Sequence, residues 1–177
     1  KLARLRFVPM AGFAGQGPWI HPQKEHPMNA PASHASPAFQ ALERLVLSMP
    51  MARTLGLTFT RIALGEVEVE IPVQEAFTFR PGQLQATPVF AIADFAAVAA
   101  AATTLPPGWI NATVDATLKL VAPAQGVALR ARGRVIDAGK LLTVCAADVY
   151  AVAQDGTETL CATLLGTARN IDMNPRP

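Results

Sequence analysis

The chain has no histidine after His34, and its serines are confined to Ser33, Ser36 and Ser48. A Ser-His-Asp or Cys-His arrangement therefore cannot be assembled in the rest of the chain, and a histidine-based metal site is excluded there as well. The sequence also lacks a GxGxxG motif and a P-loop. Any catalysis must use carboxylates, amides, hydroxyls or backbone dipoles, and we expect no metal and no cofactor.

Cysteine is scarce too: Cys145 and Cys161 both lie in apolar, strand-like runs, which indicates buried thiols rather than a disulfide framework. The most apolar stretch, residues 89–102, is interrupted by Asp94 and is shorter than the roughly 18 residues of a membrane span. The net charge is only +2, and no basic run is interleaved with aromatics. We expect a soluble, cytoplasmic protein that binds neither membrane nor nucleic acid.

The first 37 residues differ from the rest, because they hold all three histidines and several prolines without a hydrophobic period. We expect a leader over residues 1–37, a folded domain over 38–172 and a tail over 173–177. Met28 opens a segment that reads like a natural start. Residues 1–27 are therefore expected to be an extension that the native chain lacks or that comes from an upstream start.

Apolar residues at helical spacing predict a helix that begins at Pro37 and is kinked or ended by Pro50. Two strand-like runs follow, over residues 57–62 and 66–71. The second alternates strictly between glutamate and apolar residues, as a strand with one wet and one buried face does. The two runs predict a hairpin that turns at Gly65.

After a loop over residues 74–85, an alanine-rich helix is expected, with Thr87 as N-cap and Pro88 as first helical residue. Because it has no polar face, we expect it to be buried on all sides. Short turn sequences then separate four strand runs, at 110–121, 127–136, 141–153 and 159–171. This order predicts an α+β fold rather than a parallel α/β sheet.

Asp94 departs from this pattern, because it lies two turns into the apolar helix between Ala93 and Phe95. Burying an unpaired carboxylate is costly, so such groups are usually paired or functional. Two readings stay open. Either Asp94 takes part in chemistry, or it points out through a gap and pairs with a nearby arginine or threonine.

Two polar strand faces offer further candidates. Strand alternation places four side chains on one face of the first long strand: Asn111, Thr113, Asp115 and Thr117. Three basic side chains share a face of the next strand: Arg130, Arg132 and Arg134. Each face is either a solvated surface or part of a site. In the second reading, the arginines would bind phosphate groups of a cofactor-like thioester.

The stretch from Gly82 to Asp94, GQLQATPVFAIAD, resembles a known signature. It is similar to the start of the central helix in hotdog-fold acyl-CoA thioesterases of the PaaI (phenylacetic acid degradation) type, whose pattern is close to G-x-x-H-G-G-x-x-x-A-L-A-D. Residues from about 40 to 171 follow the element order of that family. The resemblance implies an antiparallel sheet wrapped around a central helix, and a homodimer or a dimer of dimers.

The resemblance implies that Asp94 is the catalytic residue, acting as nucleophile or as general base toward water. Gln85 stands where many members have histidine, and Ala86 and Thr87 replace two glycines. Where an asparagine often lies, this chain has Phe79 or Arg80. The family builds each site from the loop of one subunit and the aspartate of the other.

We therefore predict an acyl-CoA thioesterase in which Asp94 is base or nucleophile, while the Gln85 amide and the Ala86 N–H orient the thioester carbonyl. Four further residues are predicted to contact the substrate: Arg80, Thr87, Thr113 and Arg132. The alternative is a protein of the same fold that binds an acyl-CoA or another apolar ligand without hydrolysing it, because the family's histidine and glycines are replaced.

Overall fold

The computed structural model describes residues 36–174. The predicted leader, apart from Ser36 and Pro37, lies outside this range, and so do the expected extension over 1–27 and the last three residues of the predicted tail. The helices are α1 (Pro37–Ser48), α2 (Pro50–Leu55) and α3 (Ala86–Ala102), with a 3-10 turn, η1 (Glu75–Phe77). The strands are β1 (Thr58–Ala63), β2 (Glu66–Pro72), β3 (Thr78–Arg80), β4 (Gln83–Leu84), β5 (Trp109–Leu120), β6 (Ala128–Ala138), β7 (Leu142–Val152) and β8 (Glu158–Asp172).

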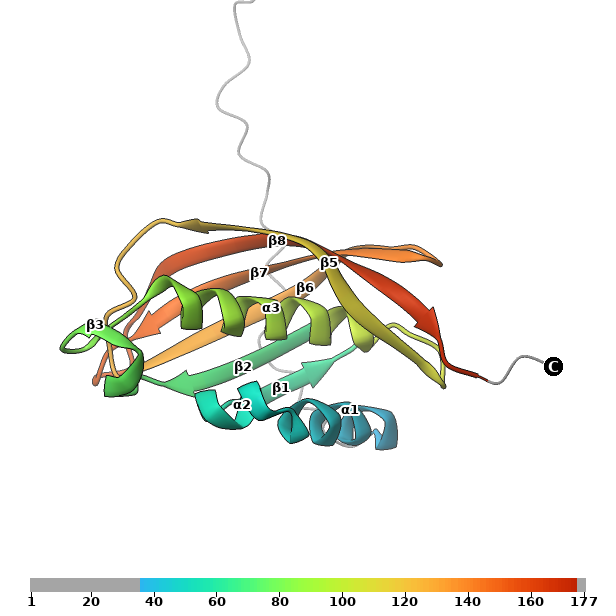
Figure 1. The fold of residues 1–177 in the computed structure, drawn as a ribbon, viewed down its shortest axis with the longest axis horizontal. Helices are drawn as coiled ribbons and strands as arrows, with labels where there is room; N and C mark the ends of the chain where they lie inside the picture. The colour runs from blue at the N-terminus through green and yellow to red at the C-terminus, as the bar shows by residue number, and fades with distance from the viewer. Residues whose placement is uncertain (1–35, 175–177) are drawn as a thin grey trace, which may run out of the picture. The chain divides into compact units, whose positions relative to one another are not determined.

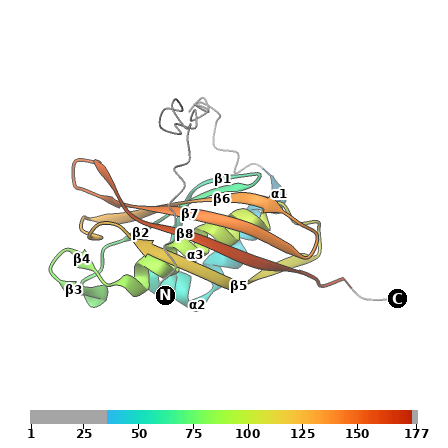
Figure 2. The same cartoon turned by 90° about the horizontal axis from the view of Figure 1, so that it is seen from above.

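The main sheet has six strands in the order β1-β2-β6-β7-β8-β5, and every neighbouring pair is antiparallel. Figures 1 and 2 show the sheet curving around α3, and α1 packs against β1 and α2. Helix α3 packs against strands β2, β5, β6, β7 and β8. The predicted α+β architecture, an antiparallel sheet wrapped around a central helix, is confirmed. Within residues 36–174, no helix is long and apolar enough to cross a membrane.

The sequence patterns of the first elements are confirmed by the structure. Helix α1 ends at Ser48, and Pro50 begins α2 as its first residue, where a missing N–H costs nothing. Strands β1 and β2 form the predicted hairpin, with Gly65 at a φ of 75° in the turn.

Cys145 and Cys161 are buried free thiols, and burial raises the pKa of each to about 11.

Two predictions for α3 were wrong. The helix begins at Ala86 with Gln85 as N-cap, so Thr87 is its second residue and Pro88 its third. Proline fits anywhere in a first turn whose N–H groups have no partner inside the helix, so its position did not determine the start. The helix is also not buried on all sides, because Thr87 and Phe90 are exposed.

The prediction that four polar side chains share one face of β5 was wrong as well. A β-bulge lies between Thr113 and Asp115 in the pairing of β5 with β8, and it places one extra residue in β5. Beyond the bulge, Ala116 and Leu118 pack against the core. Asn111 and Thr113 therefore share a face with Ala116 and Leu118, and Asp115 and Thr117 lie on the other face.

Helix α3 lies so close to β6 that one strand position must be glycine. A Cβ atom on Gly133 would overlap the backbone carbonyl oxygen of Ala96. The helix presents small side chains to the sheet, and Ala93, Ala96 and Ala97 are fully buried. This close approach fixes which side of α3 faces the sheet, and hence which side is left to form a pocket.

We predict that Gly133→Ala lowers the free energy of unfolding by about 1–3 kcal/mol, the usual cost of overpacking a core. The matched control is Arg134→Ala on the same strand, which removes only an ion pair to Asp148 between half-exposed side chains and is expected to cost less than about 1 kcal/mol. Urea unfolding of both variants measures the difference. Equal losses in the two variants would show that the contact with α3 is loose.

Candidate functional site

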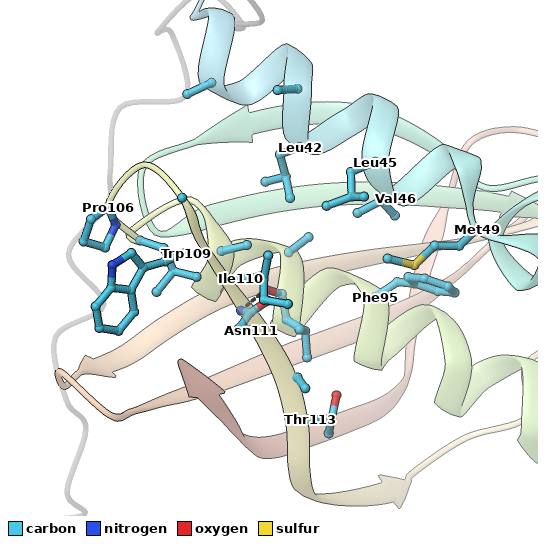
Figure 3. A pocket seen from close by; sticks show the side chains of 18 of the residues that line it. Leu42, Leu45, Val46, Met49, Phe95, Pro106, Trp109, Ile110, Asn111 and Thr113 are labelled. Atoms are coloured by element: carbon cyan, nitrogen blue, oxygen red, sulfur yellow. Dashed lines mark hydrogen bonds between the residues drawn. The ribbon is translucent and has the colours of Figure 1, made fainter. Parts of the chain in front are cut away.

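A pocket of about 560 Å³ lies between α1, the C-terminal half of α3, the 105–108 loop and the start of β5 (Figure 3). Most of its lining is apolar. Three of the described lining residues carry a carboxylate, amide or hydroxyl side chain: Asp94, Asn111 and Thr113. A cavity of this size with a few convergent polar groups is typical of a small-molecule site.

The position of Asp94 follows from the periodicity of α3. Asp94, Val98 and Ala102 are four residues apart and therefore form one stripe along the helix, which lines the pocket. The stripe faces α1 and the edge strand β5, while Ala93, Ala96 and Ala97 are the fully buried side chains of the helix. This explains how a carboxylate is tolerated within so apolar a helix.

The Asp94 carboxylate is half-buried, and its Oδ1 accepts a hydrogen bond of 2.9 Å from the Thr113 hydroxyl on β5. Burial raises the pKa of Asp94 above the ordinary aspartate value, and the Thr113 hydrogen bond acts in the opposite direction without cancelling this effect. No ion pair to Asp94 occurs among residues 36–174. The threonine partner that was considered from the sequence is thus present, while an arginine partner is not.

Asn111 makes a second link between β5 and α3, because its Nδ2 donates a hydrogen bond of 2.9 Å to the Val98 carbonyl oxygen. Val98 follows Asp94 by one helical turn, and Asn111 precedes Thr113 by two strand residues. The two hydrogen bonds therefore hold the strand alongside the stripe of α3 that lines the pocket.

The residues at the start of α3 lie apart from Asp94. Gln85 is the exposed N-cap, and its Nε2 donates a hydrogen bond of 3.4 Å to the Thr78 carbonyl oxygen. Ala86 is eight residues before Asp94 on the same helix, which corresponds to about 12 Å along the axis. A single chain therefore does not bring Gln85, Ala86 or Thr87 to the Asp94 carboxylate.

Arg80 lies in the small β3–β4 hairpin. Its Nε donates a hydrogen bond to the Gln83 side chain, and its guanidinium lies 5.5 Å from the centre of the Phe79 ring. The side chain is exposed and close in sequence to the start of α3. It does not line the pocket around Asp94.

The structure places Arg132 on the opposite face of the sheet. Since its neighbour Gly133 faces α3, the Arg132 side chain points outward. It forms ion pairs with Glu68 and Glu158, at 2.7 and 2.8 Å, and lies 4.7 Å from the centre of the Tyr150 ring. Strand β6 is also an inner strand rather than an edge. Its arginines form ion pairs with neighbouring carboxylates, and Arg132 is not brought to the pocket.

Sequence reasoning missed the wall that α1 contributes to the pocket. Its helical spacing of apolar residues was visible, but that spacing is typical of core packing and does not indicate a cavity. The lining residues of α1 are Ala38, Ala41, Leu42, Leu45, Val46 and Met49. The described residues contain no cluster of three or more histidine, cysteine or acidic side chains suited to hold a metal ion.

We predict that Thr113→Val raises the pKa of Asp94 further, because the variant removes the hydroxyl that stabilises the ionised carboxylate. The carboxyl ¹³C resonance of Asp94, followed by NMR over a pH series, measures this shift. Thr117→Val is the matched control, since Thr117 is exposed on the same strand beyond the bulge. An unchanged Asp94 titration in Thr113→Val would contradict the role given to this hydrogen bond.

No family model and no curated protein matches this sequence. Solved structures do. A thioesterase family protein from Silicibacter pomeroyi is 29% identical with a TM-score of 0.72, covering 75% of this chain and 97% of that chain. A phenylacetic acid degradation-related protein from Ralstonia eutropha JMP134 is 26% identical with a TM-score of 0.62, covering 72% and 98%. The E. coli PaaI protein, at 20% identity and a TM-score of 0.65, covers 76% and 93% and has the same fold.

These similarities cover between 72% and 76% of this chain and nearly the whole length of each similar structure. The antiparallel sheet and the central helix follow the expectation from the Gly82–Asp94 signature. The resemblance to PaaI-type proteins is thereby confirmed: the chain has the hotdog fold of the thioesterase superfamily.

Proposed function

We propose that the protein is an acyl-CoA thioesterase in which Asp94 acts as general base or nucleophile. The observation that carries this proposal is the Asp94 carboxylate, which lines a mostly apolar pocket and accepts a hydrogen bond from Thr113. Burial raises the pKa of this carboxylate. A raised pKa makes the carboxylate a stronger base, and the pocket offers space for the apolar part of a thioester. The thioesterase fold supports thioester hydrolysis as the reaction class.

Two routes are open to the Asp94 carboxylate. As a general base, it accepts a proton from water while the water oxygen bonds to the carbonyl carbon; the C–S bond then breaks, and the CoA thiolate takes up a proton. As a nucleophile, it displaces the thiolate itself and forms a mixed anhydride, which water hydrolyses. In both routes, the Thr113 hydroxyl orients the carboxylate and occupies Oδ1, which leaves Oδ2 for the reaction.

Both routes need donors for the developing oxyanion. The Ala86 N–H lies in the first turn of α3, where N–H groups lack helical partners and the helix dipole favours negative charge. Pro88 has no N–H to offer, and we assign the role of second donor to the Gln85 side-chain amide. Because these groups lie about 12 Å from Asp94 along α3, we propose that they serve the Asp94 of a second subunit.

The edge strand β5 is the proposed contact between subunits. It is twelve residues long, and in the described domain it pairs only with β8. An open edge of this length with exposed apolar side chains favours pairing with another strand, and Ile110, Val114 and Leu120 are each more than 40% exposed. Since Thr113 of the same strand holds Asp94, a homodimer formed through β5 brings a second subunit close to the carboxylate. In such a dimer, Thr87 and Arg80 near the helix start would contact the substrate.

We predict that Asp94→Asn lowers kcat/KM for acyl-CoA hydrolysis by roughly 10²–10⁴-fold, since the amide neither accepts a proton nor attacks the carbonyl. The assay measures free thiol release from a panel of acyl-CoAs. Asp137→Asn is the matched control, an exposed carboxylate at the end of β6 and outside the pocket, and is expected to leave the rate unchanged. Hydrolysis by Asp94→Asn at the wild-type rate would overturn the role of Asp94. Tight binding of acyl-CoA by a wild type that shows no turnover would favour the non-catalytic alternative.

A second prediction tests whether the site is shared between subunits. Mixing inactive Asp94→Asn with impaired Gln85→Ala should restore about a quarter of wild-type activity, because half of the dimers are mixed and each mixed dimer has one intact shared site. Subunit exchange followed by the thiol assay measures this recovery. Mixing Asp94→Asn with the double variant Asp94→Asn/Gln85→Ala is the control and restores nothing. Failure of the first mixture to recover would show that Asp94 and Gln85 do not form a site shared between subunits.

A further inference from the structure

We propose that the pocket between α1, α3 and β5 holds the acyl chain, and that its end at Ala102, Pro106 and Trp109 limits the substrates to medium-chain acyl groups. The inference rests on the proposed function for the reaction that Asp94 performs. It adds the chemical class of the acyl group and the residues that select its length.

The direction of the pocket follows from the two hydrogen bonds between α3 and β5. Thr113 bonds to Asp94, and Asn111 bonds to Val98. Four helical residues advance about 6 Å and two strand residues about 6.6 Å, so the helix and the strand run side by side in opposite directions at matching steps. The next step places Ala102 level with Trp109, two turns from the Asp94 carboxylate.

The pocket therefore has two distinct ends. Figure 3 shows Met49 next to Phe95 on one side, and Pro106 next to Trp109 on the other. The 105–108 loop, which connects α3 to β5, lines the second end with two prolines and a leucine. From Asp94 to Ala102 the helix rises about 12 Å, which matches an extended acyl chain of roughly eight to ten carbons.

The lining between these ends suits an alkyl chain. Beyond Asp94, Thr113 and Asn111, the pocket is lined by aliphatic, aromatic and proline residues, and Asp94 is its only charged lining residue among those described. The Asn111 amide already donates to the Val98 carbonyl. Leu45 and Met49 of α1 line the pocket while 51% and 39% exposed, so an alkyl chain would cover apolar surface there. A charged acyl group would find no partner at the far end.

Small side chains provide the space. Ala99 and Ala102 lie on the wall that α3 contributes, and Ala38 and Ala41 on the wall from α1. A larger side chain at Ala102 would occupy the part of the pocket reached only by the last carbons of the acyl chain. Substitution there should therefore change length selectivity without disturbing the carboxylate two turns away.

The wild-type profile is the first test. With straight-chain acyl-CoAs from butanoyl to tetradecanoyl, kcat/KM should rise by roughly fourfold per methylene, the gain expected from burying each group. The rise should stop at roughly eight to ten carbons, the length that the 12 Å between Asp94 and Ala102 accommodates. A flat profile, or a rise that continues through tetradecanoyl, would overturn the proposal.

Two variants test the residues that set the limit. Ala102→Leu adds three carbons and should lower kcat/KM for decanoyl-CoA by roughly 10- to 60-fold, while butanoyl-CoA is hydrolysed as by wild type. Trp109→Ala should shift the limit to longer chains, an effect that poor folding cannot mimic. Ala153→Leu, at an exposed position outside the pocket, is the matched control and should keep the wild-type profile. Equal loss at every chain length in Ala102→Leu, with no shift in Trp109→Ala, would overturn the assignment.

The pocket can also be tested apart from catalysis. Non-hydrolysable S-alkyl-CoA thioethers of the same lengths, titrated by calorimetry, should show the same length limit and the same shift in Ala102→Leu. If this holds while no acyl-CoA is hydrolysed, the proposed function fails and the pocket assignment stands. If hydrolysis depends on Asp94 but neither binding nor rate depends on chain length, the pocket assignment fails and the proposed function stands.

Discussion

The close contact between α3 and β6 determines where the polar groups of the site lie. Gly133 allows the helix backbone to approach the strand, and the alanines of α3 fill the narrow space between them. Once that side of the helix is committed to the sheet, periodicity places Asp94, Val98 and Ala102 on another side, toward α1 and β5. The carboxylate is thus kept out of the core by the same packing that makes the helix so apolar.

The energetic balance at Asp94 follows from this placement. Burial raises the pKa of the Asp94 carboxyl, so the folded protein holds this proton more tightly than the unfolded chain does. Ionised Asp94 therefore lowers folding stability at pH values above the raised pKa. It has no such effect at a pH low enough to protonate the carboxyl in both the folded and the unfolded protein. Thr113 offsets part of this cost through one hydrogen bond. A neutral side chain would avoid the cost altogether. A charge kept at a destabilising position is characteristic of functional sites, where stability is given up for reactivity.

The sequence was sufficient for the elements whose signals are local. Alternation in β2, the turn at Gly65 and the apolar run of α3 each predicted what the structure contains. Non-local geometry was out of reach. The bulge after Thr113 moves the following side chains of β5 to the opposite faces of the strand, and no residue type in the sequence indicates a bulge. Strict alternation along the strand therefore predicted that Asp115 and Thr113 share a face. Gly133 reads as an ordinary strand glycine until α3 is packed against it, and the α1 wall of the pocket exists only through tertiary packing.

The position of Asp94 in the middle of α3 links the proposed acyl pocket to the proposed dimer. If the acyl chain lies along the C-terminal half of the helix, its carbonyl must lie near Asp94. The free N–H groups of the same helix are then about 12 Å away. Two-fold pairing through β5 reverses the direction of the second α3, so its N-terminus approaches from the other side. Under this proposal, the long open edge of β5 is required for catalysis as well as for assembly, because one chain supplies the base and the acyl pocket while its partner supplies the oxyanion donors.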